Sequence, residues 1–231
     1  MSLEAKLRDG LGDLALSLSD VQIAAILKYQ GLISKWNKGY NLTAIRDEQD
    51  MLHSHLLDSL AAVKPLMRYL DGLPGGVSRR VLDVGSGAGL PGVILAICLP
   101  TLEVTCVDTV GKKAAFIQQA ALGLALANLK SVHARVETLG GHSGVGTWDV
   151  VCSRAFASLI DFTNWSKAAL KPDGVWMAMK GKYPSEELAA LGPDVQMFHV
   201  EQLKVPGLNA DRCLLWLRPG MASSAVSGAA E

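Results

Sequence analysis

A cluster of glycines and acids in the middle of the chain has the composition of a ligand-binding turn. Three glycines follow a short apolar run that itself contains an acid: Asp83, Gly85, Gly87 and Gly89. Asp108 ends the next apolar run along the chain. Glycines at the end of a buried strand let the backbone approach a ligand closely. In open α/β sheets, ligands bind beyond the carboxyl ends of the strands.

Two classes of ligand use such a turn, namely dinucleotides and S-adenosylmethionine. The dinucleotide fingerprint G-x-G-x-x-G requires a glycine at its sixth position, where this chain has Leu90. The Asp83 carboxylate would repel a nearby pyrophosphate, whereas it suits a sulfonium ligand that carries an α-amino group. Asp108 can accept hydrogen bonds from ribose hydroxyls, which both ligands contain. The turn therefore favours S-adenosylmethionine over a dinucleotide as the ligand, which argues against a nicotinamide-dependent oxidoreductase. Competition binding with the two cofactors would discriminate between these functions.

The elements that must position this turn alternate between short apolar runs and helical segments. We expect strands at 81–84, 103–108, 130–134, 149–153 and 175–179, and helices at 91–99, 112–122 and 159–170. This alternation is typical of βα units around a parallel sheet. Two further runs, 195–205 and 212–217, predict a terminal antiparallel hairpin. The expected fold is α/β and Rossmann-like, with a mostly parallel twisted sheet, an antiparallel C-terminal hairpin and N-terminal helices.

The first 70 residues predict helices. Ser19 and Gln22 form a capping box, and the helix that follows is expected to end at Gly39. A second helix is expected at 47–64, stopped or kinked by Pro65. We therefore divide the chain into an N-terminal helical extension packed on the core (1–70), an S-adenosylmethionine-binding methyltransferase domain (71–219) and a flexible tail (220–231).

Bulk properties exclude several classes of protein. Lys plus Arg and Asp plus Glu both number 22, so the formal net charge is zero, which argues against tight, sequence-indifferent binding to naked nucleic acid. The four cysteines form no C-x-x-C pair, so we expect reduced core thiols and no metal site. The N-terminus lacks the apolar region of a signal peptide, and the longest apolar stretch is too short to cross a bilayer.

The segment after the fourth expected strand bears on the methyl acceptor. It reads VCSRAF (151–156) and lacks the Pro-Pro motif of enzymes that methylate exocyclic amines. Cys152 lies inside an apolar strand with no preceding proline, so a core role is favoured over a covalent nucleophile. An acceptor that needs neither a base nor a covalent intermediate remains. Guanine N7 fits, because its lone pair is free at neutral pH and transfer then requires mainly positioning and exclusion of water.

Six segments together resemble one family. They are WNKGYNLTAIRD (36–47), HLLDS (55–59), VLDVGSGAGLPG (81–92), ARVE (134–137), SRAFASL (153–159) and MKG (179–181). The chain resembles, from about residue 19 to 218, the small-subunit rRNA guanine-N7 methyltransferases called RsmG, first named glucose-inhibited division protein B (GidB). The resemblance implies methylation of one guanine in a conserved loop of 16S rRNA, in the bacterial cytoplasm. The implied partner is 16S rRNA within a small-subunit ribosomal particle, with no membrane, metal or protein partner.

The resemblance also implies roles for individual residues. The cofactor-binding set is Asp83, Gly85, Gly87, Gly89, Leu90, Asp108, Thr109, Val136, Glu137 and Arg154. Arg154 and Lys180 are the expected catalytic residues, and Arg135, Lys180 and Arg212 are expected to contact RNA. For Arg135 a solvated surface position is as plausible as an RNA contact, and Arg212 could simply flank the hairpin.

The spacing of polar residues in the N-terminal helices leaves some roles open. His55 and Asp58 share a helix face at i, i+3 and are expected to form a structural hydrogen-bonded pair, although they could line the site. Trp36 could stack on RNA, but a place in the core is favoured.

Two other functions compete with rRNA methylation. A small-molecule methyltransferase would need a lid over an apolar pocket, whereas an rRNA enzyme needs an open, positively charged site entrance. Lys182 and the basic residues named above favour the open entrance. A non-catalytic S-adenosylmethionine-binding or ribosome-assembly module would bind cofactor or RNA and give no methylated product. The chain departs from the family pattern in a longer linker at 74–80, a longer loop at 140–147 and an extension after Pro219.

Overall fold

The computed structural model describes residues 1–74, 78–140, 148–156 and 158–220. Their strands form one seven-stranded sheet in the order β3-β2-β1-β4-β5-β7-β6. The strands are β1 (Arg80–Val84), β2 (Glu103–Asp108), β3 (Leu129–His133), β4 (Trp148–Arg154), β5 (Leu170–Lys180), β6 (Val195–Gln202) and β7 (Cys213–Pro219). The first five pair in parallel, while β7 is antiparallel to β5 and to β6. The predicted fold class and C-terminal hairpin are confirmed.

The helices alternate with the strands as the sequence predicts. They are α1 (Leu3–Asp13), α2 (Asp20–Tyr40), α3 (Glu48–Met51), α4 (Asp58–Leu60), α5 (Val63–Asp71), α6 (Gly92–Cys98), α7 (Gly111–Gly123), α8 (Leu159–Ser166) and α9 (Ser185–Ala189). Short turns of other helical types are η1 (Leu52–Leu57), η2 (Val136–Thr138) and η4 (Lys167–Ala169). The expected helix 159–170 ends earlier, because Leu170 already belongs to β5.

Helix α2 begins as predicted but ends at Tyr40, one residue beyond the expected end at Gly39. The Ser19 side chain accepts a hydrogen bond from the Gln22 backbone, and the Gln22 side chain accepts one from the Ser19 backbone. At the other end, Asn41 adopts a left-handed conformation with φ of 49° and terminates the helix. The prediction for Gly39 was wrong because asparagine is one of the few residues other than glycine that adopt this conformation readily.

The expected second helix contains a π-helical turn, and Pro65 does not stop it. The turn η1 (Leu52–Leu57) separates α3 from α4, and α5 then runs through Pro65. Proline is tolerated there because it lies in the first turn of α5, where backbone N–H groups have no partner within the helix. Insertions of this π type often occur at functional sites, and η1 presents Ser54 and His55 to the pocket described below.

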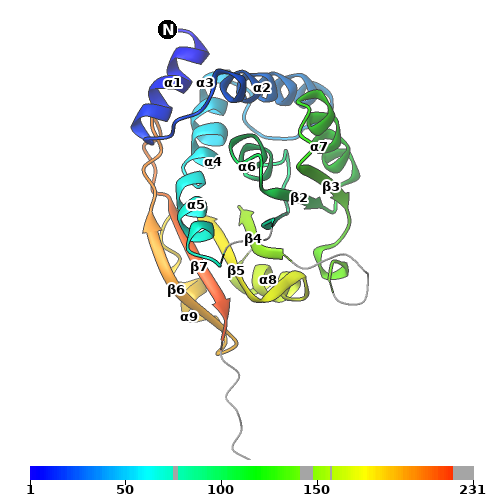
Figure 1. Cartoon of the computed structure of the whole chain (residues 1–231), viewed down its shortest axis with the longest axis vertical. Helices are drawn as coiled ribbons and strands as arrows, with labels where there is room; N and C mark the ends of the chain where they lie inside the picture. The colour runs from blue at the N-terminus through cyan, green and yellow to red at the C-terminus, as the bar shows by residue number, and fades with distance from the viewer. Residues whose placement is uncertain (75–77, 141–147, 157, 221–231) are drawn as a thin grey trace, which may run out of the picture.

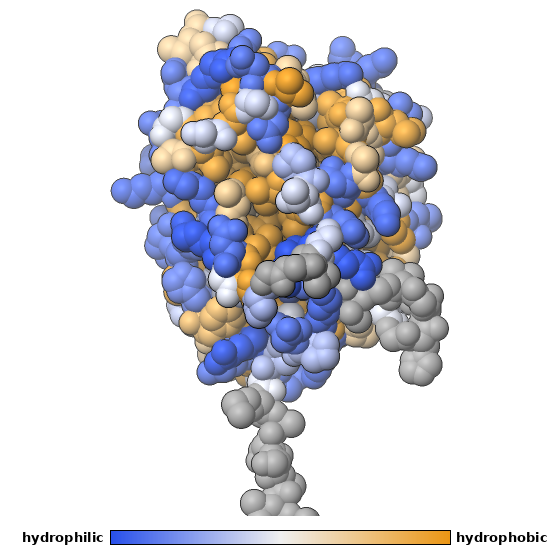
Figure 2. Space-filling model, viewed as in Figure 1, coloured by the Kyte–Doolittle hydropathy of each residue, from blue (hydrophilic) through white to orange (hydrophobic). Residues whose placement is uncertain are grey.

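Helices cover both faces of the sheet. Along β1, Val81 packs into the larger hydrophobic cluster, which also includes residues of α1 to α7, whereas Leu82 and Val84 pack into a smaller cluster with α8. Figure 1 shows α2 lying across one end of the molecule above α6 and α7, and α5 alongside β7. In Figure 2 polar residues surround this face, while hydrophobic residues gather toward its centre. The N-terminal helices thus share one core with the sheet, and the division at residue 70 stays a prediction.

Some predictions fall on residues that the structure does not describe. Most of the expected loop at 140–147, part of the linker at 74–80 and nearly all of the tail lie outside the described residues. Within the described part of the chain, no helix combines the length and hydropathy needed to span a bilayer.

Candidate functional site

The glycine turn lies where the strand order of the sheet reverses. Strand β1 pairs with β2 on one side and with β4 on the other, so the turn after β1 opens at the switch point where α/β proteins bind ligands. Gly85 and Gly87 have φ of 64° and 59°, a region that residues with a side chain rarely adopt. The Gly87 amide donates to Oδ2 of Asp108 at 2.9 Å. The two predicted ligand-binding segments are therefore joined by a hydrogen bond.

Helix α2 contacts this turn through a hydrogen bond. The buried Tyr29 hydroxyl donates to the Ala88 carbonyl at 2.5 Å. Gly89 has φ of 91°, and a Cβ there would lie 2.5 Å from Val93 of α6. Helix α2 thus contributes directly to the shape of the turn.

A cavity of about 680 Å³ opens beside the turn, between it and the N-terminal helices. Its wall contains six of the residues predicted from the sequence: Gly85, Gly87, Leu90, Arg154, Lys180 and Arg212. It also contains residues of the loop after α2, of η1, of α4 and of α7: Leu42, Thr43, Ile45, Ser54, His55, Asp58 and Lys113. We call this cavity the central pocket.

Two arginines of the central pocket share one buried carboxylate. Arg154 Nη1 lies 2.9 Å from Oδ2 of Asp58, and Arg212 Nε lies 2.8 Å from Oδ1. The Asp58 side chain is only 4% exposed. Arg154 Nη1 also donates to the Ser54 carbonyl at 2.9 Å. Arg212 is thus part of the site. One carboxylate holds two guanidinium groups in the pocket wall, so this group of three side chains carries a net charge of one positive unit.

His55 and Asp58 do not form the expected hydrogen-bonded pair. They meet through Arg154, whose Nη2 lies 3.3 Å from His55 Nδ1, while His55 Nε2 lies 2.7 Å from the Thr43 hydroxyl. Burial, followed by the Arg154 charge, lowers the pKa of His55. The prediction was wrong because both side chains contact Arg154 and not each other. The alternative, that they line the site, is the one observed.

The loop after α2 is shaped by a buried asparagine. Asn37 accepts a hydrogen bond from the Thr43 amide at 3.0 Å and donates one to the Ile45 carbonyl at 3.2 Å. This arrangement directs Thr43 and Ile45 to the central pocket. Trp36 lies outside the pocket wall, where it is half-buried and packs against Phe116 with ring centroids 5.5 Å apart.

Lys180 lies in the pocket wall with its charge paired. Its ammonium is 2.8 and 3.0 Å from the two carboxylate oxygens of Glu187 in α9. The same carboxylate accepts a hydrogen bond from the Leu159 amide at the start of α8. Glu187 therefore links the end of β5 to two helices. Neither α9 nor Glu187 is predicted from the sequence, because the helix has five residues and no apolar periodicity.

Asp83 lies behind the glycine turn and outside the pocket wall. Its side chain is fully buried; Oδ2 accepts from the Gly92 amide at 2.9 Å, and Oδ1 has no hydrogen-bond partner among the described residues. Burial raises the pKa of this carboxyl to about 7. An unpaired buried carboxylate oxygen beside a ligand-binding turn suits a cationic ligand, because a positive charge nearby would offset the cost of burying the anion.

Replacing Asp83 with asparagine is expected to change how stability depends on pH. The folded pKa lies above the ordinary value of 3.8, so the native state binds the extra proton and stability falls as pH rises from about 4 to about 7. The asparagine side chain does not titrate, so the variant does not lose stability for this reason as pH rises. Relative to the variant, the wild type should lose on the order of 2 kcal/mol between pH 5 and pH 8, measured by denaturant unfolding. If the free energies of unfolding of wild type and variant differed by the same amount at pH 5 and pH 8, the pKa of Asp83 would not be raised.

The remaining predicted cofactor residues follow the carboxyl edge of the sheet beyond the pocket wall. Asp108 is buried, and its Oδ1 accepts from the Val110 amide at 2.8 Å. Thr109 is exposed, and the buried Val136 begins the turn η2. Glu137 forms an ion pair with Arg135 at 2.8 Å, and the Arg135 side chain is 69% exposed. Of the ten predicted cofactor residues, four therefore line the central pocket, namely Gly85, Gly87, Leu90 and Arg154, while Asp108, Thr109, Val136 and Glu137 follow the adjoining edge.

A comparison with family models shows which protein family contains this chain. The model "GidB: rRNA small subunit methyltransferase G" matches residues 22–215, which include every element of the central pocket. The chain belongs to the GidB family. A relative in Polaromonas naphthalenivorans (strain CJ2), named ribosomal RNA small subunit methyltransferase G, is 61% identical over 220 residues, covering 94% of this chain and 96% of the relative. One of the same name in Methylibium petroleiphilum is 50% identical, with 94% of each covered.

Solved structures agree with the GidB fold. TrmN from Thermus thermophilus superposes with a TM-score of 0.52 and 21% identity over 73% of this chain and 53% of that one. The 1,6-didemethyltoxoflavin-N1-methyltransferase of Burkholderia thailandensis superposes with a TM-score of 0.53 and 16% identity, covering 88% and 92%. At these identities the likeness concerns the fold, which is the Rossmann-like fold of methyltransferases.

Proposed function

We propose that this chain transfers a methyl group from S-adenosyl-L-methionine to N7 of one guanine in 16S rRNA. The observation that carries the proposal is the central pocket, where a glycine turn at the sheet switch point faces two guanidinium groups held by one buried carboxylate. Membership of the GidB family supports rRNA of the small subunit as the substrate.

The residues of the central pocket, of the turn behind it and of the adjoining sheet edge fit the cofactor. The unpaired Oδ1 of Asp83 lies behind a turn in which Gly85 and Gly87, both with positive φ, line the cavity. Arg154 uses Nη1 for Asp58 and Ser54, while its Nε–H has no partner among the described residues and can donate to a carboxylate such as that of methionine. We assign the ribose to Asp108 and the adenine to Val136 and Glu137. When bound, S-adenosylmethionine supplies a methyl group on a sulfonium, which a lone pair can accept without a base.

The absence of a free base among the pocket residues supports N7 as the acceptor. Both ring nitrogens of His55 have polar neighbours, and Arg154 directs a donor at one of them. Burial raises the pKa of the Cys106 and Cys152 thiols far above the ordinary value, so neither is a thiolate at neutral pH. Guanine N7 carries no proton, so the chain needs only to orient the base, exclude water and hold compensating charge.

The test is methyl transfer from labelled S-adenosylmethionine to small-subunit particles that lack the modification. The product is mapped by borohydride and aniline cleavage followed by reverse transcription, which reports N7-methylguanine. One cleavage site in 16S rRNA is expected. Cofactor binding by calorimetry without label in any rRNA would overturn the assignment and favour a small-molecule acceptor.

Replacing Cys152 with alanine is expected to leave the turnover number within about twofold of wild type, because a buried protonated thiol takes no part in the chemistry. The side chain is fully buried in β4, so some loss of stability, about 1 kcal/mol, is expected from the smaller volume. Methyl transfer is measured at a temperature where both proteins are folded. A variant that retains cofactor binding but loses turnover would support a covalent mechanism instead.

A further inference from the structure

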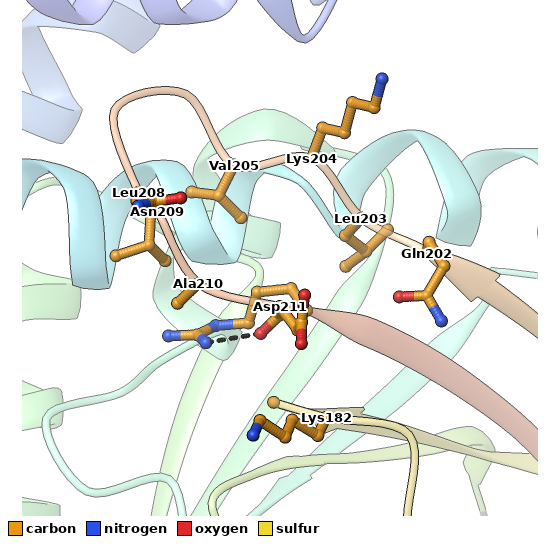
Figure 3. Close-up of a pocket in the computed structure, with 11 residues that line it drawn as sticks. Lys182, Gln202, Leu203, Lys204, Val205, Leu208, Asn209, Ala210 and Asp211 are labelled. Carbon is orange, nitrogen blue, oxygen red and sulfur yellow. Dashed lines mark hydrogen bonds between the residues drawn. The ribbon is translucent and has the colours of Figure 1, made fainter.

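A second pocket of about 840 Å³ adjoins the central one, between the end of β5 and the loop that joins β6 to β7. We call it the hairpin pocket. It shares Gly181 and Arg212 with the central pocket, so the two cavities lie next to each other. Figure 3 shows Lys182 on one side and the loop from Lys204 to Asp211 on the other, with the Lys204 side chain extending away from Lys182.

The wall of the hairpin pocket has a fixed shape. The Leu203 amide donates to the Arg212 carbonyl at 2.7 Å and closes the base of the loop. His53 Nδ1 lies 2.9 Å from the Pro206 carbonyl, and a Cβ on Gly207 would lie 2.3 Å from the His53 ring. The turn η1 therefore braces the hairpin loop with His53 while its neighbours Ser54 and His55 line the central pocket.

The chemistry of the hairpin pocket suits a polyanion that carries flat apolar groups. Lys182 and Lys204 are exposed and form no hydrogen bond or ion pair with another described residue. The loop between them contributes apolar surface from Leu203, Val205 and Leu208. The described residues that line the two pockets include six cations, Lys113, Arg154, Lys180, Lys182, Lys204 and Arg212, but only two carboxylates, Asp58 and Asp211. Because the whole chain has no net charge, this excess concentrates positive potential at the two openings.

We propose that the hairpin pocket binds the single-stranded RNA that adjoins the target guanine, with one phosphate on Lys182 just after the end of β5 and another on Lys204 at the outer side of the loop. This inference rests on the proposed function. A target base in the central pocket places its neighbouring nucleotides within one backbone step of Gly181 and Arg212, which border both cavities. The two lysines position the strand through charge, and Leu203 and Leu208 pack against the base or sugar of the neighbouring nucleotide.

The first test compares Lys182→Ala, Lys204→Ala and their double variant with Lys130→Ala, an exposed lysine of β3 at the other end of the sheet. For the double variant we expect KM for small-subunit particles to rise roughly tenfold and the log–log salt slope to become shallower by about 1.4, as for two lost phosphate contacts. The turnover number at saturating particles and the calorimetric affinity for S-adenosylmethionine should match wild type. A KM and a salt slope equal to those of Lys130→Ala would overturn the inference. If the wild type itself forms no N7-methylguanine, the proposed function fails instead.

The second test identifies what lies in the hairpin pocket. Asn209 is exposed at its rim, whereas the four native cysteines are buried, so Asn209→Cys can be labelled selectively with a thiol-reactive photocrosslinker. Lys130→Cys is the matched control. After irradiation with small-subunit particles, we expect an adduct to 16S rRNA within a few nucleotides of the methylated guanine. An adduct to ribosomal protein alone, or no more adduct than the control gives, would show that RNA does not occupy this pocket.

Discussion

Replacing Asp58 with asparagine is expected to reduce methyl transfer about 100-fold or more, in keeping with the sensitivity of catalysis to displacements of about 1 Å. The amide keeps one acceptor and presents a donor to the second guanidinium, so Arg154 or Arg212 loses its partner. Breaking a buried ion pair also costs about 3 kcal/mol, the lower end of the usual range, because both arginines are partly exposed. Turnover measurements and denaturant unfolding would check the two effects.

Asp149 provides the matched control for this prediction. It is a buried carboxylate with two cationic partners, Lys171 at 2.7 Å and Arg79 at 3.5 Å, and it accepts from the Arg80 amide. It lies at the amino end of β4, whereas Arg154 lies at the carboxyl end. Asp149→Asn should therefore lower stability while leaving turnover of the folded protein near wild type. Equal turnover in the two variants would show that Asp58 serves the fold alone.

Replacing Gly92 with alanine is expected to destabilise the protein by about 3 kcal/mol. The added Cβ would lie 2.4 Å from the Cys106 sulfur and 2.9 Å from Oδ2 of Asp83. A shift of α6 that relieved these contacts would disturb the hydrogen bond that the Gly92 amide donates to Asp83. The glycine turn should move as a result and weaken cofactor binding. Thermal unfolding and calorimetry would measure these effects.

A second glycine and a double variant separate this clash from a general effect of alanine. Gly31 is exposed within α2 and has open space where a Cβ would lie, so Gly31→Ala should raise stability by about 0.5–1 kcal/mol. Cys106→Ala removes the nearest atom and should restore part of the stability in the double variant with Gly92→Ala. Additive losses in the double variant would argue against a direct contact between the two positions.

Much of the architecture could be predicted because its signals are local. The alternation of apolar runs and helical segments predicts the parallel sheet, and the predicted bounds of the second strand, 103–108, agree with β2. The capping box of Ser19 and Gln22 is also a local signal, and it predicts the start of α2 correctly. The errors at Gly39 and Pro65 occurred where residue type alone was used, since the position of a proline or glycine within a helical turn decides whether the helix continues.

The sequence by itself determined the glycine turn after β1 and the acids beside it, since these follow one another along the chain and need no distant partner. It did not determine how the pocket wall is assembled. Asp58 lies 96 residues from Arg154 and 154 residues from Arg212, and Glu187 joins Lys180 to the start of α8 from a helix without a sequence signal. Such contacts depend on how the N-terminal helices and the C-terminal hairpin pack on the carboxyl edge of the sheet. Only the tertiary structure decides that two arginines share one carboxylate there, because their pairing depends on the relative placement of three elements that no local pattern encodes.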